Sequence, residues 1–305
     1  MYCNHPVEVF YGSPRTIAAL ILMTISLLSI VLHVLFILAS RKLAGWNSDF
    51  AFTLLIGMSC CSLVRFILEI VCDAVALTYV DFCSHHHLFT FLGAIELSSY
   101  LTLILLSVLI TIHRIIYTIF ATKAASLLPP AIAKTTVFVV AIISVVILCI
   151  VQSDDVHYHY VPPRLYFDDL AESTSHLLRL TGSLANYSLG VTNLIAYPII
   201  FLYLHSRHSL SFTRNDELRM TIQVTLFVII ECIFFVYWEF IENTRQTTSA
   251  SALLTSSIIK LVFYDSIIFP YLLINKRVQN RIVDIVTCRS TSRQPLCNVI
   301  VYASG

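Results

Sequence analysis

The stretch Leu88–Tyr117 is an apolar run that carries one acid, Glu96, near its start and the pair His113 and Arg114 near its end. A charged side chain at membrane depth is costly, so it usually forms an internal pair or serves a function. Glu96 lies eighteen residues before Arg114, which is about 27 Å along an α-helix. Its carboxylate either contacts a bound ligand or pairs with a basic residue of another helix, and both interpretations stay open.

A second polar group is formed by Arg65, Glu69 and Asp73, which recur every four residues in the preceding apolar run. Residues four apart share one face of a helix, so these side chains predict a single polar stripe. Lys260 and Arg65 are the candidate partners for Glu96, and Asp265 is a candidate partner for Arg65. We interpret the stripe as a structural polar core, with a conformational switch around the same residues as the alternative.

Further candidates lie in the apolar runs toward the C-terminus. Glu231 falls in the middle of one run, and Trp238 and Glu239 lie near its end. Lys260 lies in the last run, where an internal carboxylate partner would explain it. The predicted ligand site consists of Glu96, Tyr100, Trp238, Glu239 and Lys260. Packing against neighbouring helices is the alternative for the residues toward the C-terminus.

The composition predicts a membrane protein. Hydrophobic residues make up 57% of the 305 residues and charged residues only 12%, whereas a soluble domain carries about 25% charged residues. The formal net charge of +1 argues against a nucleic-acid partner. The nine cysteines show no metal-ligand spacing. No phosphate-binding loop, nucleophile elbow or zinc-protease motif occurs, so we predict no enzyme and no cofactor.

Seven apolar runs are long enough, or nearly so, to cross a bilayer, which takes about 20 residues of helix. Because backbone polar groups find no water inside a bilayer, each run is predicted to be helical. The runs are Ile17–Ala39, Phe50–Ala76, Leu88–Ile112, Thr135–Val151, Leu184–Leu204, Met220–Phe240 and Ala252–Ile274. The expected fold is an all-α membrane protein, a seven-transmembrane helix bundle.

The orientation follows from the basic residues, which gather in cytoplasmic loops. If the loops alternate between two sides, one side holds thirteen Lys and Arg residues and the other holds four. The first side is therefore cytoplasmic, so the N-terminus lies outside and the C-terminus inside. We divide the chain into an extracellular N-terminus (1–16), the bundle (17–274) and a cytoplasmic tail (275–305).

The tail begins with a pattern typical of an amphipathic helix. Val278, Ile282, Ile285 and Val286 recur at helical spacing, and polar residues fill the other face. Such a helix would lie on the inner leaflet of the bilayer. Cys288 follows it, in a position suited to palmitoylation. An ordinary basic tail is the alternative.

The chain resembles the nematode serpentine chemoreceptors, a family of seven-transmembrane receptors similar to G-protein-coupled receptors. The segments LITIHRIIY, ELRMTIQVTLF and FYDSIIFPYLLINKRVQNRI carry the resemblance, together with the short termini and compact loops. The resemblance implies a chemosensory receptor in the plasma membrane, and in a sensory cilium. It implies a heterotrimeric G protein as partner and an external small molecule or peptide as ligand. His113, Arg114, Pro270 and Tyr271 would form the switch that couples to the G protein.

The chain also departs from the pattern of most such receptors. His113 stands where an acid or Asn usually precedes the Arg, and Pro270 follows Phe269 instead of Asn. The loop after the fourth span has no cysteine, which leaves Cys83 without its expected disulfide partner; Cys3 and Cys149 are the possible substitutes.

Two further points stay open. A small transporter or proton-coupled carrier is the alternative function, because buried charges can also line a substrate or proton path. Histidines at 85–87, 157 and 159 could meet above the third span and respond to zinc or pH, whereas solvated loop histidines are the alternative.

Overall fold

The computed structural model describes residues 8–43, 50–120, 123, 129–152, 158–169, 175–206, 225–226, 229–242 and 249–287. Helices coincide with all seven predicted spans, the sixth of them in part. They are α1 (Ser13–Leu43), α2 (Phe50–Leu77), α3 (His86–Ile119), α5 (Pro130–Val151), α6 (Ser175–Ser206), helical residues at 225–226 and 229–236 followed by the π-helix η2 (Tyr237–Glu242), α8 (Ala250–Ser266) and α9 (Phe269–Ile274).

Within the described part of the chain, four helices are long and apolar enough to cross a membrane. They are Ser13–Arg41, Phe50–Leu77, His86–Ile119 and Leu180–Tyr203, and a shorter apolar helix covers Thr135–Val151. The seventh predicted span is divided into α8 and α9. The division falls at Ile267 and Ile268, just before Pro270, the second residue of α9, because proline has no N–H to donate to the preceding turn.

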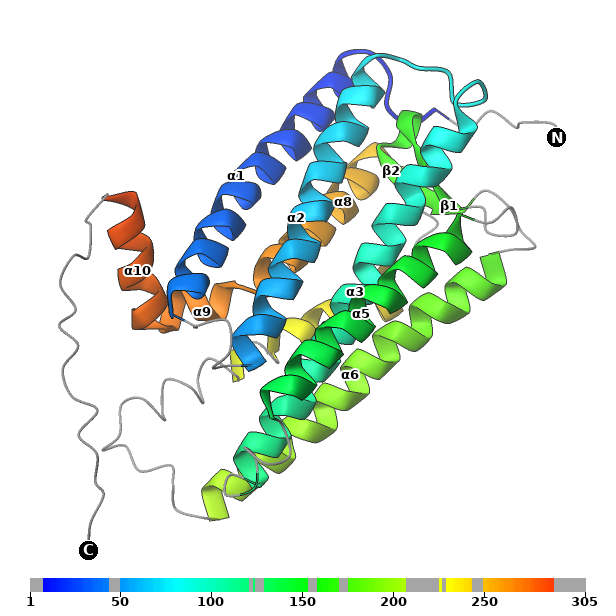
Figure 1. Cartoon of the computed structure of the whole chain (residues 1–305). Helices are drawn as coiled ribbons and strands as arrows, with labels where there is room; N and C mark the ends of the chain where they lie inside the picture. Colours follow the sequence, from blue (N-terminus) through cyan, green and yellow to red (C-terminus); the bar gives the residue numbers. More distant parts are fainter. Residues whose placement is uncertain are drawn as a thin grey trace, which may run out of the picture.

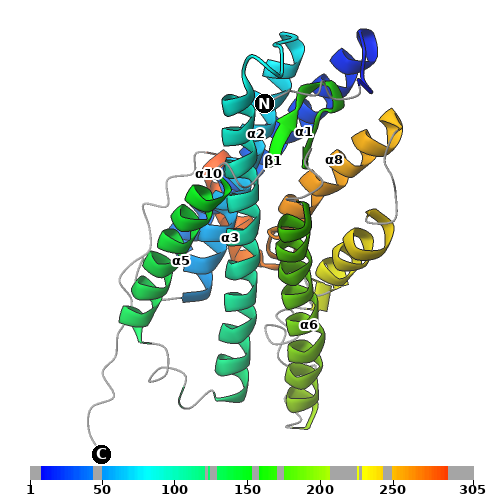
Figure 2. The same cartoon turned by 90° about the vertical axis from the view of Figure 1, so that its right-hand side faces the viewer.

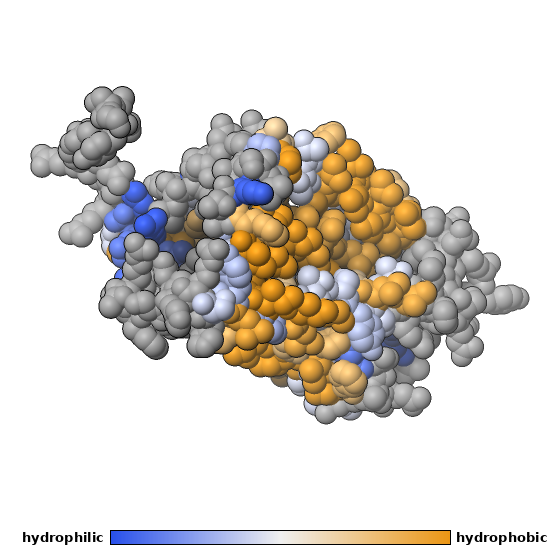
Figure 3. Space-filling model, turned by 90° about the horizontal axis from the view of Figure 1, so that it is seen from below, coloured by the Kyte–Doolittle hydropathy of each residue, from blue (hydrophilic) through white to orange (hydrophobic). Residues whose placement is uncertain are grey.

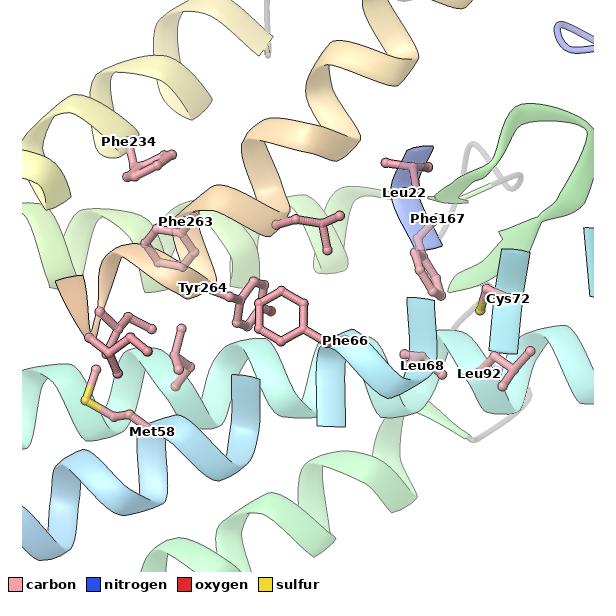
Figure 4. Packing of buried hydrophobic residues seen from close by; sticks show 14 of the residues in the cluster. Leu22, Met58, Phe66, Leu68, Cys72, Leu92, Phe167, Phe234, Phe263 and Tyr264 are labelled. Atoms are coloured by element: carbon pink, nitrogen blue, oxygen red, sulfur yellow. The ribbon is translucent and has the colours of Figure 1, made fainter. Parts of the chain in front are cut away.

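Helix α3 occupies the centre of one half of the bundle. It packs against α2, α5 and α6, and Figure 2 shows it between α5 and α6. Helices α1 and α2 pack side by side, with α8 against both. Figure 4 shows part of the apolar core where these helices meet, including Phe66 against Tyr264 and Phe234 beside Phe263.

The bundle has apolar side chains outside and polar side chains inside. Large apolar residues such as Leu28, Phe138 and Leu202 are exposed on the helix surfaces, and hydrophobic residues cover most of the described surface in Figure 3. Arg65 and Asp73 are buried instead. This distribution suits a protein whose helices contact lipid and satisfy their polar groups internally.

A β-hairpin, which the all-α expectation did not include, covers one end of the bundle (Figure 1). Strands β1 (Tyr158–Val161) and β2 (Tyr166–Asp169) pair antiparallel, with Val161 opposite Tyr166. The turn contains Pro162 and Pro163, and Leu165 adopts the left-handed conformation (φ 49°). The hairpin belongs to the loop between α5 and α6, so it lies on the side predicted to be extracellular.

Gly93 of α3 is the point on which strand β1 rests. A Cβ atom at this position would lie 2.3 Å from the carbonyl oxygen of Tyr158 and 2.8 Å from the Cα of His159. Because any larger residue would meet backbone there, glycine allows the strand to lie directly against the helix.

The amphipathic helix predicted after the seventh span is present as α10 (Lys276–Val286). The Asn275 side chain caps it by accepting bonds from the N–H groups of Arg277 and Val278. Val278 is buried, and the helix packs against α1 at the end opposite the hairpin. Cys288 lies outside the described residues.

Cys83, in the turn before α3, is disulfide-bonded. Of its two candidate partners, Cys149 is free, and Cys3 lies outside the described residues.

Candidate functional site

The outer polar centre is a buried ionic group formed by Arg65, Glu69 and Glu96, together with Tyr158 of the hairpin. Arg65 forms an ion pair with Glu69 one turn along α2, and its Nε lies 3.7 Å from Oε1 of Glu96 on α3. The side chains of the three charged residues are 2%, 3% and 7% exposed. Glu96 thus has the internal partner that was left open as the alternative to ligand contact.

Tyr158 supplies the remaining bond to this centre. Its hydroxyl donates to Oε2 of Glu96 over 2.9 Å, so both oxygens of Glu96 are engaged. Burial raises the pKa of Tyr158 well above its ordinary value, and the nearby Glu96 carboxylate raises it further. The hydroxyl therefore stays protonated and keeps donating to Glu96.

The hairpin covers this centre through strand β2 as well. The Phe167 ring centroid lies 5.2 Å from the Arg65 guanidinium, a cation–π contact. Lys260 of α8 donates to the hydroxyl of Tyr166 (2.5 Å) and lies over the ring of the same residue. Lys260, predicted to be a ligand residue, is therefore held by the hairpin.

Asp265 does not pair with Arg65 as predicted. Ser29 of α1 donates to its Oδ2 over 2.7 Å, and His33 Nε2 lies 3.4 Å from its Oδ1. Asp265 thus connects α8 to α1, whereas Arg65 faces α3. The sequence placed both residues in the bundle interior, but the rotation of each helix decides which neighbour a side chain meets.

A second polar group, the middle polar centre, joins three helices around Glu231. Ser107 of α3 donates to one carboxylate oxygen (2.6 Å) and Asn193 of α6 donates to the other. Thr111 donates to Oδ1 of Asn193 over 2.8 Å. Glu231 is buried and is held by neutral donors. It connects the sixth span to α3 and α6.

Three of the predicted ligand residues, Tyr100, Trp238 and Glu239, lie together between α3, α6 and η2. The rings of Tyr100 and Trp238 meet edge to face with centroids 6.1 Å apart. Asn186 of α6 links the other two: Tyr100 donates to its Oδ1, and its Nδ2 donates to Oε1 of Glu239 over 3.1 Å. We call these four residues the Glu239 cluster.

At the opposite end of α3, the predicted switch residues form a contact between helices. Arg114 Nη2 donates to the hydroxyl of Tyr271 on α9 over 3.3 Å. Tyr271 directly follows Pro270 in the first turn of α9, the last short helix of the seventh span. The His113 ring packs against Phe50 and Tyr117, with centroids 5.3 and 4.3 Å away.

Two of the outer histidines, His86 and His159, lie in contact. The rings of His86 and His159 lie edge to face with centroids 5.5 Å apart, and Phe82 packs against both. His157 lies outside the described residues. Among the residues that the structure describes, no group of three His, Cys, Asp or Glu side chains could hold a metal ion.

Several residues of these sites had no role in the sequence analysis. Tyr158 and Tyr166 lie in a loop, where only the alternation of the segment around Tyr158 hinted at a strand. Asn186 and Asn193 are uncharged, so a search for ionisable residues at membrane depth did not single them out. Their roles follow from the carboxylates that they contact.

The fold and these sites define a polytopic helical membrane protein that has buried polar centres and a contact between the third and seventh spans at its inner end. The family model described as serpentine type 7TM GPCR chemoreceptor Srt matches residues 2–295. The chain belongs to this family of seven-transmembrane chemoreceptors, as its resemblance to nematode serpentine receptors predicted. A search of curated proteins gave no match.

Proposed function

We propose that this protein is a G-protein-coupled chemosensory receptor of the plasma membrane, and of a sensory cilium in particular. It binds an external small molecule or peptide and signals to a heterotrimeric G protein. The observation that supports this proposal best is the continuity of α3. This single helix carries Glu96 and Tyr100 near its outer end and Arg114 near its inner end.

The ligand acts at the outer half of the bundle. The Glu239 cluster lies where α3, α6 and the sixth span meet. The hairpin separates Glu96 and Lys260 from the outside by bonding to both. A ligand that binds against the hairpin or at the cluster therefore contacts residues that are hydrogen-bonded to α3.

The G protein acts at the inner half. The bond from Arg114 to Tyr271 holds α3 and α9 together, and the closed arrangement of the inner ends depends on it. A ligand that binds better when this contact is open shifts the population toward the open form. Helix α10 lies along the inner leaflet beside this region, and Cys288 is a palmitoylation site that strengthens its attachment.

The test uses purified protein in lipid nanodiscs with a heterotrimeric G protein, and nucleotide exchange as the readout. Tyr271→Phe removes the hydroxyl that accepts from Arg114 but keeps the ring. We expect it to raise basal exchange, and Arg114→Ala to abolish ligand-stimulated exchange. Tyr203→Phe is the control, because it removes a hydroxyl that donates to the carbonyl oxygen of Ile119 at the end of the same helix α3 and keeps the bond from Arg114 to Tyr271.

A carrier would behave differently in the same experiment. Uptake of a solute or protons by sealed vesicles that contain the protein, with no effect on nucleotide exchange, would replace the receptor assignment with the transporter alternative.

A further inference from the structure

Among the side chains that the structure describes, none is a cationic partner of the Glu239 carboxylate. Asn186 donates to Oε1, and no described side chain bonds to Oε2. Two other buried acids, Glu96 and Glu231, differ in this respect. Glu96 has both oxygens engaged by Arg65 and Tyr158, and Glu231 has both engaged by neutral donors.

The basic side chains described in the outer half of the protein contact other groups. The pairs are Arg15 with Glu8, Arg65 with Glu69 and Glu96, Arg164 with Asp168, and Lys260 with Tyr166. A cation close to a half-buried carboxylate stabilises the negative charge strongly, because the attraction between two charges increases as the local dielectric constant falls. None of these described basic side chains supplies that cation to Glu239.

Aromatic rings surround the same position. Trp238 contacts Tyr100, Phe234 and Phe263, with ring centroids 6.1, 5.6 and 4.6 Å away. Aromatic faces attract ammonium groups through their quadrupoles, and tryptophan does so most strongly. A carboxylate beside such rings suits an organic cation better than it suits a metal ion, which requires several oxygen ligands.

Two buried donors, one in the cluster and one close to it, have no acceptor among the side chains and backbone that the structure describes. Trp238 Nε1 and the Tyr264 hydroxyl have no hydrogen-bond partner among the described residues. The buried Tyr264 ring lies 5.6 Å from the ring of Phe263, which in turn contacts Trp238 of the cluster. Buried donors in native proteins are nearly always satisfied, so each of these has an acceptor to gain from a bound molecule.

We propose that the Glu239 cluster binds an organic ammonium ion that also carries a hydrogen-bond acceptor. The ammonium group pairs with Oε2 of Glu239 and lies against Trp238 and Tyr100. The acceptor receives the hydrogen bond of Trp238 Nε1 or of Tyr264. This inference rests on the proposed receptor function, and it assigns charge recognition to Glu239 in the sixth span instead of Glu96 in the third.

The experiment uses Trp238 as the reporter. The chain has two tryptophans, so the variant Trp46→Phe leaves Trp238 as the only source of tryptophan emission. Primary alkyl- and arylalkylammonium ions, with and without a hydroxyl, are titrated into this variant in nanodiscs. The alcohols that match them in shape, such as 2-phenylethanol for phenethylammonium, are titrated in parallel. We expect a saturable change in emission with the ammonium ions and a binding constant at least about tenfold weaker for the alcohols.

Substitutions then test the role of the carboxylate. Glu239→Gln keeps an acceptor for Asn186 but removes the charge, and we expect it to weaken ammonium binding by about tenfold or more. Glu239→Asp keeps the charge and retains part of the affinity. Asp168→Asn is the matched control: it removes one acidic charge from the outer surface without touching the cluster, and it leaves binding within about twofold.

Three outcomes would overturn the assignment: no saturable response to any ammonium ion, equal affinity for the matched alcohols, or equal weakening by Glu239→Gln and Asp168→Asn. None of these readouts involves a G protein. Ammonium binding without an effect on nucleotide exchange would keep the site and reject the proposed coupling. Exchange driven only by an uncharged compound would keep the receptor and reject the ammonium ligand.

Discussion

Replacing Arg65 with methionine removes the only cation of the outer polar centre and leaves Glu69 and Glu96 facing each other inside the bundle. The side chains of all three residues are less than one-tenth exposed, so water cannot screen the two remaining carboxylates. Breaking a buried ion pair on one side costs about 3–5 kcal/mol. We expect the free energy of unfolding of Arg65→Met to fall by about that amount.

The control for this substitution is Arg164→Met in the hairpin. Arg164 pairs with Asp168 at 2.6 Å, but these side chains are 24% and 29% exposed, and partly solvated pairs contribute at most about 1 kcal/mol. The triple variant Arg65→Met, Glu69→Gln, Glu96→Gln leaves no charged side chain in the centre. We expect it to recover most of the lost stability, because neutral side chains of similar size replace a buried ionic group at little cost.

Thermal unfolding of the purified variants in the same detergent measures all three effects. The interpretation of the outer polar centre as an ionic core would be refuted if Arg65→Met were no more destabilising than Arg164→Met. It would also be refuted if the neutral triple variant were as unstable as the single variant, since the loss would then come from packing and not from uncompensated charge.

Three further predictions follow from other parts of the structure. Gly93→Ala forces the backbone of Tyr158 away from α3 and should cost about 1–3 kcal/mol and increase amide exchange in the hairpin, whereas Gly182→Ala, where an added Cβ meets nothing within 4 Å, should do neither; equal effects would contradict the close contact. His113→Asp places a permanent negative charge beside Arg114 and should lower basal nucleotide exchange. His113→Asn, which adds no charge, is its control, and an unchanged baseline would count against the idea. Asn275→Ala removes the cap of α10 and should destabilise that helix by about 1 kcal/mol, seen as faster amide exchange in 276–286 while α1 keeps its protection.

The helical spans were predictable because the thickness of a bilayer fixes how long an apolar run must be. The predicted starts at Phe50 and Leu88 lie within two residues of the starts of α2 and α3. Helix α10 was predictable for a similar reason, since an amphipathic helix is defined by the period of its own sequence. Such properties are local, so each can be recognised without knowledge of the neighbouring helices.

The partners of the buried charges were not predictable in the same way. Glu96 and Asp265 were both candidates for Arg65, and only Glu96 meets it. The choice depends on the rotation of each helix and on the depth at which two helices cross, which the packing of the whole bundle sets. The contributions of Tyr158 and Tyr166 depend on a hairpin whose position is fixed by its contact with α3 at Gly93.

The sequence by itself determined that this chain crosses a membrane as a helical bundle and which ionisable side chains lie at membrane depth. These properties follow from hydrophobicity and charge, which each residue carries wherever it lies. Only the tertiary structure decided that Glu96 is engaged internally, whereas no described side chain bonds to Oε2 of Glu239. Whether a charge is neutralised depends on distances of a few ångströms between separate helices, and packing alone sets those distances.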